Sequence, residues 1–242
     1  TAHWSVVQQA VQLCEPIIKL LRIADGDSPS VGKIHSRAYA VQQHLASAQQ
    51  QLGVPAAVME QVKKVWQDRW AFMDSPMHGA GYCLDPEHLC DEGLGLSNAS
   101  DSSVHDLMTM IRRLLQQEER QAARLSYAAF RAGEGIFGSE DALEDAPCMP
   151  AHQWWETYGG GHPELQKLAM LVLSQVSSAC SCERAWSAYD FIHNKRRNRL
   201  TAARARDLVY VFTNGRLIEK MSNGEETFVD WEQEEEMEGG EE

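Results

Sequence analysis

Apolar residues recur every three or four positions along most of the chain, which is the period of amphipathic α-helices. At the N-terminal end this stripe consists of Trp4, Val7, Val11, Cys14, Ile17 and Leu21. We expect these residues to form one buried helix face. Pro16 predicts either a kink in this helix or the start of a second one. A further helix is predicted for residues 31–52, because Gly53 and Pro55 follow it.

The pattern continues through the middle of the chain with one interruption. A third helix is expected to begin at Pro55, with Val58, Val62, Val65 and Trp66 on one side. The stretch MDSPMHGAGYCLDPEHLC (73–90) contains two prolines and two glycines, which predicts a compact loop with one short helical turn. After it, one helix is expected from about residue 104 to 132, with Leu107, Ile111, Leu114 and Leu115 inside.

The C-terminal half is also helical in pattern. Residues 134–149 are acidic and contain glycine, and we interpret them as a linker. Beyond them the sequence predicts a short aromatic helix at WWETY and an apolar helix from about Pro163. A helix containing Glu183 follows, and then a last helix from about 201 to 214, whose LVYVF segment is expected to be buried on most sides. The predicted fold class is all-α, a multi-helix bundle.

Composition limits the classes of protein that need consideration. The chain has 242 residues and a net charge of -13. Residues 219–242 hold eleven acidic residues and one lysine, which is typical of a solvated, disordered tail. No apolar run reaches about 18 residues, so no membrane partner is expected.

Six cysteines are spread irregularly, which favours reduced thiols inside the cell over a secreted disulfide framework. The spacing of His78, Cys83, His88 and Cys90 fits no standard zinc pattern.

One stretch, SCERAWSAYDFIHNKRRNRL (181–200), carries candidate chemistry. On a helical wheel, Ala179, Cys182, Trp186 and Tyr189 form the packing face, and the carboxylates of Glu183 and Asp190 lie at its edge. A partly buried acid needs a cation, a hydrogen bond or a metal. The basic residues that follow suit DNA phosphate contacts: Lys195, Arg196, Arg197 and Arg199. A solvated turn that offsets the acidic tail is the alternative.

The same stretch resembles the C-terminal dimerisation region of hAT-family transposases. The resemblance lies in a tryptophan pair, an apolar helix, a "CER-x-WS" motif and an "FIH-x-K-x-RNRL" motif. Here these are Trp154 and Trp155, residues 165–173, residues 182–187 and residues 191–200. Upstream, residues 14–35 and 72–89 are also similar to segments of that family.

The resemblance implies a ribonuclease-H-like core in which two aspartates and one glutamate bind Mg or Mn. The glutamate corresponds to Glu183, which would be a catalytic metal ligand only in a full-length parent. The two aspartates and the core sheet are not found in this sequence, so we expect no cofactor for the chain alone and no DNA cleavage by it. The expected regions are a helical insertion-like part (1–133), the linker (134–149), a dimerisation-like part (150–218) and the tail (219–242).

The leading functional interpretation is therefore self-association of a transposase fragment or domesticated remnant, nuclear or otherwise intracellular and not secreted, with DNA as a second partner. The residues expected to supply either the dimer contact or only a monomer's core are Trp154, Trp155, Leu168, Leu171, Trp186, Leu208, Val211 and Phe212. One alternative is part of an active transposase that uses Glu183. Another is a helical adaptor whose acidic tail binds a basic partner.

Overall fold

The computed structural model describes residues 2–26, 28–89, 100–179, 183, 186, 189, 190, 192 and 201–222. Every regular element within these residues is a helix, so the predicted all-α class is confirmed. The chain divides into two compact units, one made of Thr1–Ala24 and Pro29–Ser177 and the other of Asp25–Ser28 and Ser178–Glu242. We describe each unit by itself.

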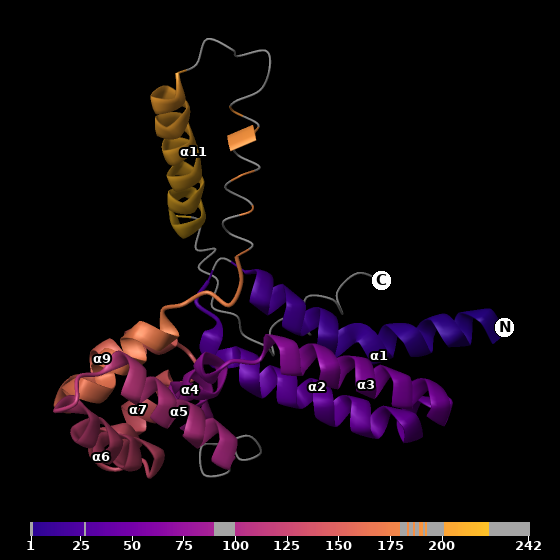
Figure 1. Cartoon of the computed structure of the whole chain (residues 1–242), viewed down its shortest axis with the longest axis horizontal. Helices are drawn as coiled ribbons and strands as arrows, with labels where there is room; N and C mark the ends of the chain where they lie inside the picture. The colour runs from indigo at the N-terminus through magenta and orange to yellow at the C-terminus, as the bar shows by residue number, and fades with distance from the viewer. Residues whose placement is uncertain are drawn as a thin grey trace. The chain divides into compact units, whose positions relative to one another are not determined.

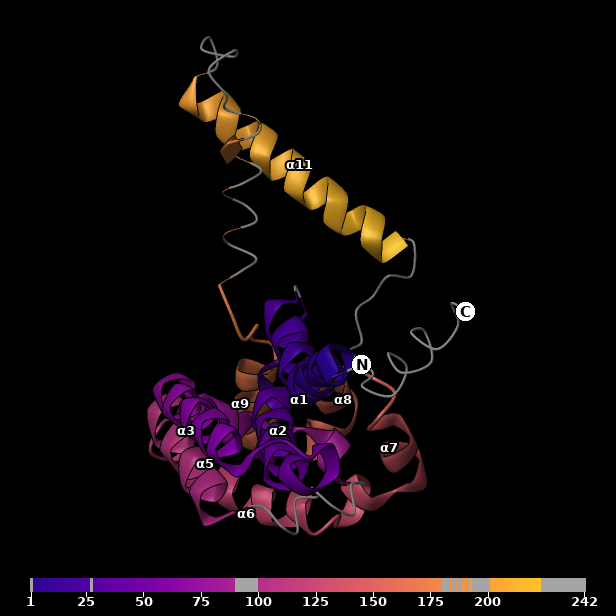
Figure 2. The same ribbon diagram turned by 90° about the vertical axis from the view of Figure 1, so that its right-hand side faces the viewer.

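The first unit begins with a three-helix arm, formed by α1 (Ala2–Asp25), α2 (Val31–Leu52) and α3 (Ala56–Met73), which lie alongside one another in Figures 1 and 2. The predicted end of α2 is confirmed, because Gly53 adopts a left-handed φ of 66° that favours glycine. The α1 helix is joined to α2 by polar contacts. The Gln9 side chain donates to the Leu52 carbonyl at 2.8 Å, and a His44 ring nitrogen lies 3.1 Å from the Gln12 carbonyl.

The predicted buried face of α1 is wrong. The helix runs through Pro16 without ending and buries Leu13, Leu20 and Ile23 instead. Trp4 is 69% exposed, Val11 61% and Leu21 54%. The α1 helix carries two apolar faces, and periodicity alone does not tell which one packs. The α3 helix behaves in the same way, because Val58 and Val65 are exposed while Met59 is buried.

The segment predicted as a loop is a buried helix, α4 (Pro76–Leu84), followed by the short helix η1 (Pro86–Leu89). Its glycines mark close packing rather than a turn. A Cβ on Gly79 would collide with the Asp106 carboxylate, and a Cβ on Gly81 would lie 3.0 Å from the Val31 carbonyl oxygen. The glycines therefore let α4 approach α2 and α5 closely, which is why the sequence signal was misread.

The predicted long helix at 104–132 is in fact two helices, α5 (Asp101–Leu114) and α6 (Glu119–Arg131). Leu115 ends the first and is buried, as expected, whereas Leu114 is partly exposed. The break is held by side chains, since the Arg120 guanidinium donates to the carbonyls of Leu115 and Arg112. These bonds satisfy carbonyl groups that the end of α5 leaves without helical partners.

Short helices enclose the remaining core of the first unit. They are η3 (Gly135–Gly138), α7 (Glu140–Asp145), α8 (Ala151–Tyr158), η4 (Gly159–Gly161) and α9 (Pro163–Leu173). The α8 and α9 helices confirm the predicted aromatic and apolar helices. Within residues 134–149, which the sequence suggested were a linker, Phe137, Ala142 and Ala146 are buried in the same core cluster as α8. We call the part from α4 to α9 the helical core.

The second unit contains α11 (Ala202–Ser222), which extends past the predicted end at residue 214. Positions 183, 186, 189, 190 and 192 have helical backbone, in agreement with the helix expected around Glu183. Residues 223–242, most of the predicted tail, lie outside the described residues. In the part of the chain that the structure describes, no helix is long and apolar enough to cross a lipid bilayer.

Candidate self-association surface

The two tryptophans of α8 belong to the helical core and have no exposed surface. The Trp154 indole N–H donates to the Ala142 carbonyl at 2.8 Å, and the Trp155 indole N–H donates to the Leu84 carbonyl at 2.7 Å. Their rings pack against those of Phe130 and Phe137. A buried indole N–H is costly without an acceptor, and both have one. Of the two roles left open by the sequence, these residues take the core role.

On the α9 helix, one of the two predicted residues is buried and the other is exposed. Leu168 is fully buried in the helical core, together with Leu165 and Val172. Leu171 lies on the other side of the helix and is 45% exposed. A single exposed leucine on a protein surface is ordinary, so Leu171 by itself does not define an interface.

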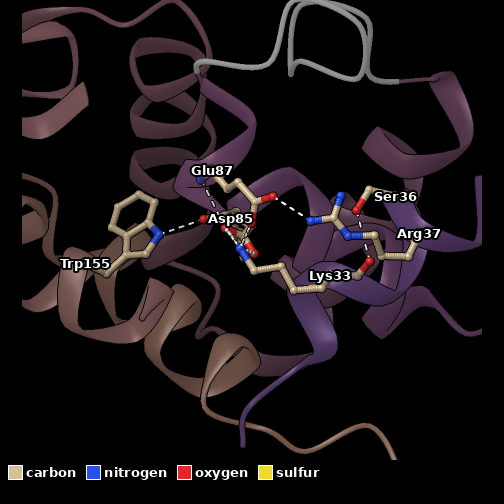
Figure 3. A network of polar contacts seen from close by, with 7 residues as sticks. Lys33, Ser36, Arg37, Asp85, Glu87 and Trp155 are labelled. Atoms are coloured by element: carbon tan, nitrogen blue, oxygen red, sulfur yellow. Dashed lines mark hydrogen bonds and ion pairs between the residues drawn. The ribbon is translucent and has the colours of Figure 1, made fainter. Parts of the chain in front are cut away.

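A buried ion network lies close to Trp155 of α8 (Figure 3). The Lys33 ammonium on α2 pairs with the Asp85 carboxylate at 3.1 Å and also with Glu87 of η1, and the Arg37 guanidinium donates to Glu87 at 2.9 Å. Asp85 directly follows Leu84, whose carbonyl accepts the Trp155 bond. The network therefore joins the arm to the segment on which α8 rests. Sequence reasoning missed it because the partners are about fifty positions apart.

The charges of this network shift one another's pKa values. Burial alone would raise the pKa of Glu87, but the neighbouring Lys33 and Arg37 charges lower it to about 2. Burial alone would lower the pKa of Lys33, and the charges of Asp85 and Glu87 instead raise it. Burial lowers the pKa of His88, whose ring packs 4.6 Å from that of Tyr82. Buried opposite charges that are hydrogen-bonded to one another help to hold packed segments in a fixed arrangement. We therefore assign this network a structural role.

The second unit presents the remaining predicted residues to solvent. Trp186 is 71% exposed, and its ring makes an edge contact with Tyr189 at 6.0 Å between centroids. Trp186 was expected on a packing face, but within this chain that ring is largely uncovered. Ile192, six residues further along the chain, is buried.

Within the second unit, the α11 helix carries an exposed apolar stripe. It consists of Leu208, Val211, Phe212 and Ile218, which are 45%, 67%, 37% and 63% exposed. At 100° per residue these four side chains fall within an arc of about 120°, and we call this set the α11 stripe. Tyr210, also exposed, lies on the opposite side of the helix. The prediction that LVYVF is buried on most sides is wrong, because Leu208, Tyr210, Val211 and Phe212 are exposed and Val209 is only half-buried.

Charged residues lie at the two ends of the α11 stripe. Arg204 precedes it and Glu219 follows it, both exposed and both within the same arc of the helix. Gly215 lies between Leu208 and Ile218 on that face, and among the described residues no atom beyond the nearby backbone of α11 lies within 4 Å of its Cβ position. The Arg216 guanidinium lies 5.6 Å from the centre of the Phe212 ring. The surface is thus apolar in the middle and charged at its ends.

The structure describes few of the residues that were predicted to take part in catalysis or DNA binding. The Glu183 side chain is exposed, and its backbone N–H donates to the Ala179 carbonyl at 3.1 Å, as in a helix. Asp190 is exposed as well. The predicted phosphate-binding residues Lys195, Arg196, Arg197 and Arg199 lie outside the described residues. Their roles, and that of Glu183, stay predictions.

The described residues do not fit a resident metal ion. Among them, no group of three or more His, Cys, Asp or Glu side chains is placed so that it could hold one. Of the four residues weighed as zinc ligands, Cys83 is buried inside α4, and burial raises the pKa of its thiol to about 11. Cys90 lies outside the described residues.

Comparison with known families identifies the segment that carries these features. Residues 137–214 match the hAT family C-terminal dimerisation region. The match includes the buried tryptophans of α8, all of α9, and α11 as far as Asn214, so three of the four residues of the α11 stripe lie within it. A search of curated proteins gave no match.

Proposed function

We propose that the chain is a self-association module that pairs through the α11 stripe, because residues 137–214 match the hAT family C-terminal dimerisation region. The observation that carries the proposal is the division of the matched region into two parts. Its tryptophans at 154 and 155 are fully enclosed, whereas Leu208, Val211 and Phe212 are exposed. Contiguous apolar surface of this kind marks interaction sites on soluble proteins.

The α11 stripe is complementary to itself when two copies run antiparallel. Pairing centred between residues 211 and 212 sets Val211 against Phe212 of the second copy, and Leu208 against its Gly215. The same register sets Arg204 beside Glu219 of the second copy, so opposite charges meet at both ends. A parallel pairing would place each of these charges beside its own copy. A two-fold symmetric contact of this type is the commonest one in homo-oligomers.

The direct test is the molar mass of the purified chain by light scattering over a range of concentrations. We expect a dimer, and we expect Val211→Glu to weaken it by roughly 100-fold, because a charge would be desolvated at the centre of the contact. Tyr210→Glu is the matched control, with the same charge on the same helix but on the opposite face, and it should leave the dimer intact. A monomer at all concentrations, or equal effects of the two variants, would rule out the α11 stripe.

A charge exchange tests the antiparallel register. Arg204→Glu should weaken the dimer by roughly 3- to 10-fold at low salt, because it places two acids together. The double variant Arg204→Glu/Glu219→Arg restores the opposite charges with the order reversed, and it should recover wild-type association. If the double variant is as weak as the single one, the two residues do not meet and the register is different.

For a longer parent protein we propose the family's remaining functions for the residues that match its motifs. There Glu183 would be the third acidic ligand for Mg or Mn, which would supply the activated oxygen for DNA cleavage, and Lys195, Arg196, Arg197 and Arg199 would contact DNA phosphate. The support is that the Glu183 carboxylate lies on a helix and is exposed. We expect no nicking of DNA by the present chain with Mg. Nicking that disappears in Glu183→Gln would show that the chain alone is catalytic.

A further inference from the structure

The α1 helix of the arm carries a second apolar stripe, separate from the surface proposed for self-association. It consists of Trp4, Val7, Val11, Cys14, Ile18 and Leu21, spaced by 3, 4, 3, 4 and 3 residues. All but Val7 are exposed, and Val7 is half-buried. This spacing is the a and d pattern of a coiled coil. We call these six residues the α1 seam.

The α1 seam is not needed to hold α1 in place. The helix is anchored through its other face by Leu13, Leu20 and Ile23, all buried. Two polar contacts with α2, from Gln9 and to the Gln12 carbonyl, add to this anchoring. One face of α1 therefore serves the fold of the arm, and the seam faces solvent along the length of the helix.

The spacing of the α1 seam indicates what kind of structure can pack against it. A repeat that averages 3.5 residues accepts the side chains of another helix as knobs into holes, and it does not match the twofold period of a strand. No residue of the seam is charged, so the occupant must also present an apolar stripe. The α1 seam is itself such a stripe.

The charges on α1 select the direction of pairing. Residues 1–14 contain no Asp, Glu, Lys or Arg, whereas Glu15, Lys19, Arg22 and Asp25 all lie in the second half. A parallel pair would place Glu15 and Arg22 close to their own copies. An antiparallel pair places the charged half of each helix against the uncharged half of the other and also opposes the two helix dipoles.

We propose that α1 pairs antiparallel with α1 of a second copy of this chain. The six seam positions then form layers in which a large side chain meets a smaller one. Trp4 packs against Leu21 of the second copy, Val7 against its Ile18, and Val11 against its Cys14. Each layer occurs twice, related by the twofold axis, which gives an isologous contact.

The size of this contact shows why a second copy must already be near. A helix of 24 residues is about 36 Å long, and with a contact width of about 10 Å the pair buries roughly 700 Å² in all. Stable interfaces usually bury at least about 1,200 Å². The α1 contact is therefore weak alone and depends on a chain that is already associated, which raises its effective concentration. In this respect it rests on the self-association in the proposed function, and not on the surface through which that association occurs.

Disulfide trapping tests the pairing in the full chain. In Val11→Cys, the new thiol would face Cys14 of the second copy, so mild oxidation should give a covalent dimer several times more abundant than in wild type. The control Val11→Cys/Cys14→Ser keeps the other cysteines and removes the facing thiol, and it should return cross-linking to the wild-type level. Equal cross-linking in the two variants, or none above wild type, would overturn the antiparallel α1 contact.

The outcome separates this proposal from the one on α11. If Val11→Cys gives no added covalent dimer while Val211→Glu still dissociates the wild-type oligomer, the α1 seam has another occupant and self-association through α11 stands. If the covalent dimer forms but Val211→Glu leaves the molar mass unchanged, the α1 contact stands and the α11 stripe is ruled out. A circular dichroism spectrum of each variant checks that the total helix content, to which α1 contributes 24 residues, is unchanged.

Discussion

Two helices of the same matched region, α8 and α11, have similar apolar and aromatic composition and opposite surroundings. The tryptophans of α8 are fully enclosed by α6, α7, η3 and α9, and both of their polar hydrogens have acceptors. On α11, Tyr210 is 70% exposed and Val211 is 67% exposed. The comparison teaches that apolar content in this region has two uses. One part stabilises the monomer, and the other remains available for a second chain.

The first variant tests the stabilising half of the comparison. Trp155→Ala should lower the free energy of unfolding by roughly 3–5 kcal/mol, because it leaves a cavity and removes the donor to the Leu84 carbonyl. The measurement is chemical denaturation followed by circular dichroism. The control is Trp186→Ala, an equal truncation at a site that is 71% exposed, with an expected change within about 0.5 kcal/mol. Similar losses in the two variants would remove the distinction between the helices.

The second variant sharpens the comparison by disturbing the support beneath α8. Lys33→Met should cost about 3 kcal/mol, because Asp85 is only 1% exposed and would keep a buried charge without its ammonium partner. Lys167→Met is the control, since its ion pair with Glu119 at 2.7 Å is half-exposed and should contribute less than about 1 kcal/mol. Equal effects in a denaturation experiment would mean that the Lys33 network does not support the core.

The third prediction concerns acid stability, which should reside in the helical core. Glu87 has a pKa of about 2 in the folded chain, below its ordinary value of 4.5. As the pH falls, the Glu87 carboxylate therefore binds a proton in the unfolded chain at a higher pH than in the folded chain. Its stabilising effect is complete above pH 4.5 and is lost as the pH falls from there to about 2, by up to roughly 3 kcal/mol. The lowered pKa of His88 has the same sign and acts at higher pH, from its ordinary value near 6.5 downward.

A variant isolates the contribution of Glu87 to this profile. Glu87→Gln should be less stable than wild type at pH 7, and the difference should disappear near pH 2. The free energy of unfolding measured by denaturation at several pH values gives both curves. Curves that stay parallel down to pH 2 would contradict the lowered pKa of Glu87.

The sequence predicted the helical class, the ends of α2, and the helices α8 and α9, because these depend on local signals. Gly53 and Pro55 mark a helix boundary through their own backbone preferences, and Pro163 does the same for α9. The errors concern residues whose state depends on a distant neighbour. Gly79 and Gly81 read as a turn, but they are small because α5 and α2 pass close to them.

The candidate surface shows the same limit. The sequence identified Trp154, Trp186 and Val211 as one apolar set, and could not divide it into core and surface. That division depends on whether another helix lies over each face, which periodicity does not record. On α1 both faces have helical periodicity, and the face chosen from the pattern proved to be the exposed one. An apolar stripe in a sequence therefore predicts a contact without saying which chain provides it.

The smallest expected effect concerns α11 and is a change in concentration dependence. Val211→Ser should alter the free energy of unfolding of the dilute monomer by no more than about 0.5 kcal/mol, because the side chain is 67% exposed. The wild-type midpoint of thermal unfolding should rise with protein concentration, since association stabilises the folded state by mass action. In Val211→Ser this rise should be reduced or lost. Tyr210→Ser, on the far side of the same helix, should retain it. If both variants keep the wild-type rise, the α11 stripe does not bind a second chain, and its exposure has a cause other than self-association.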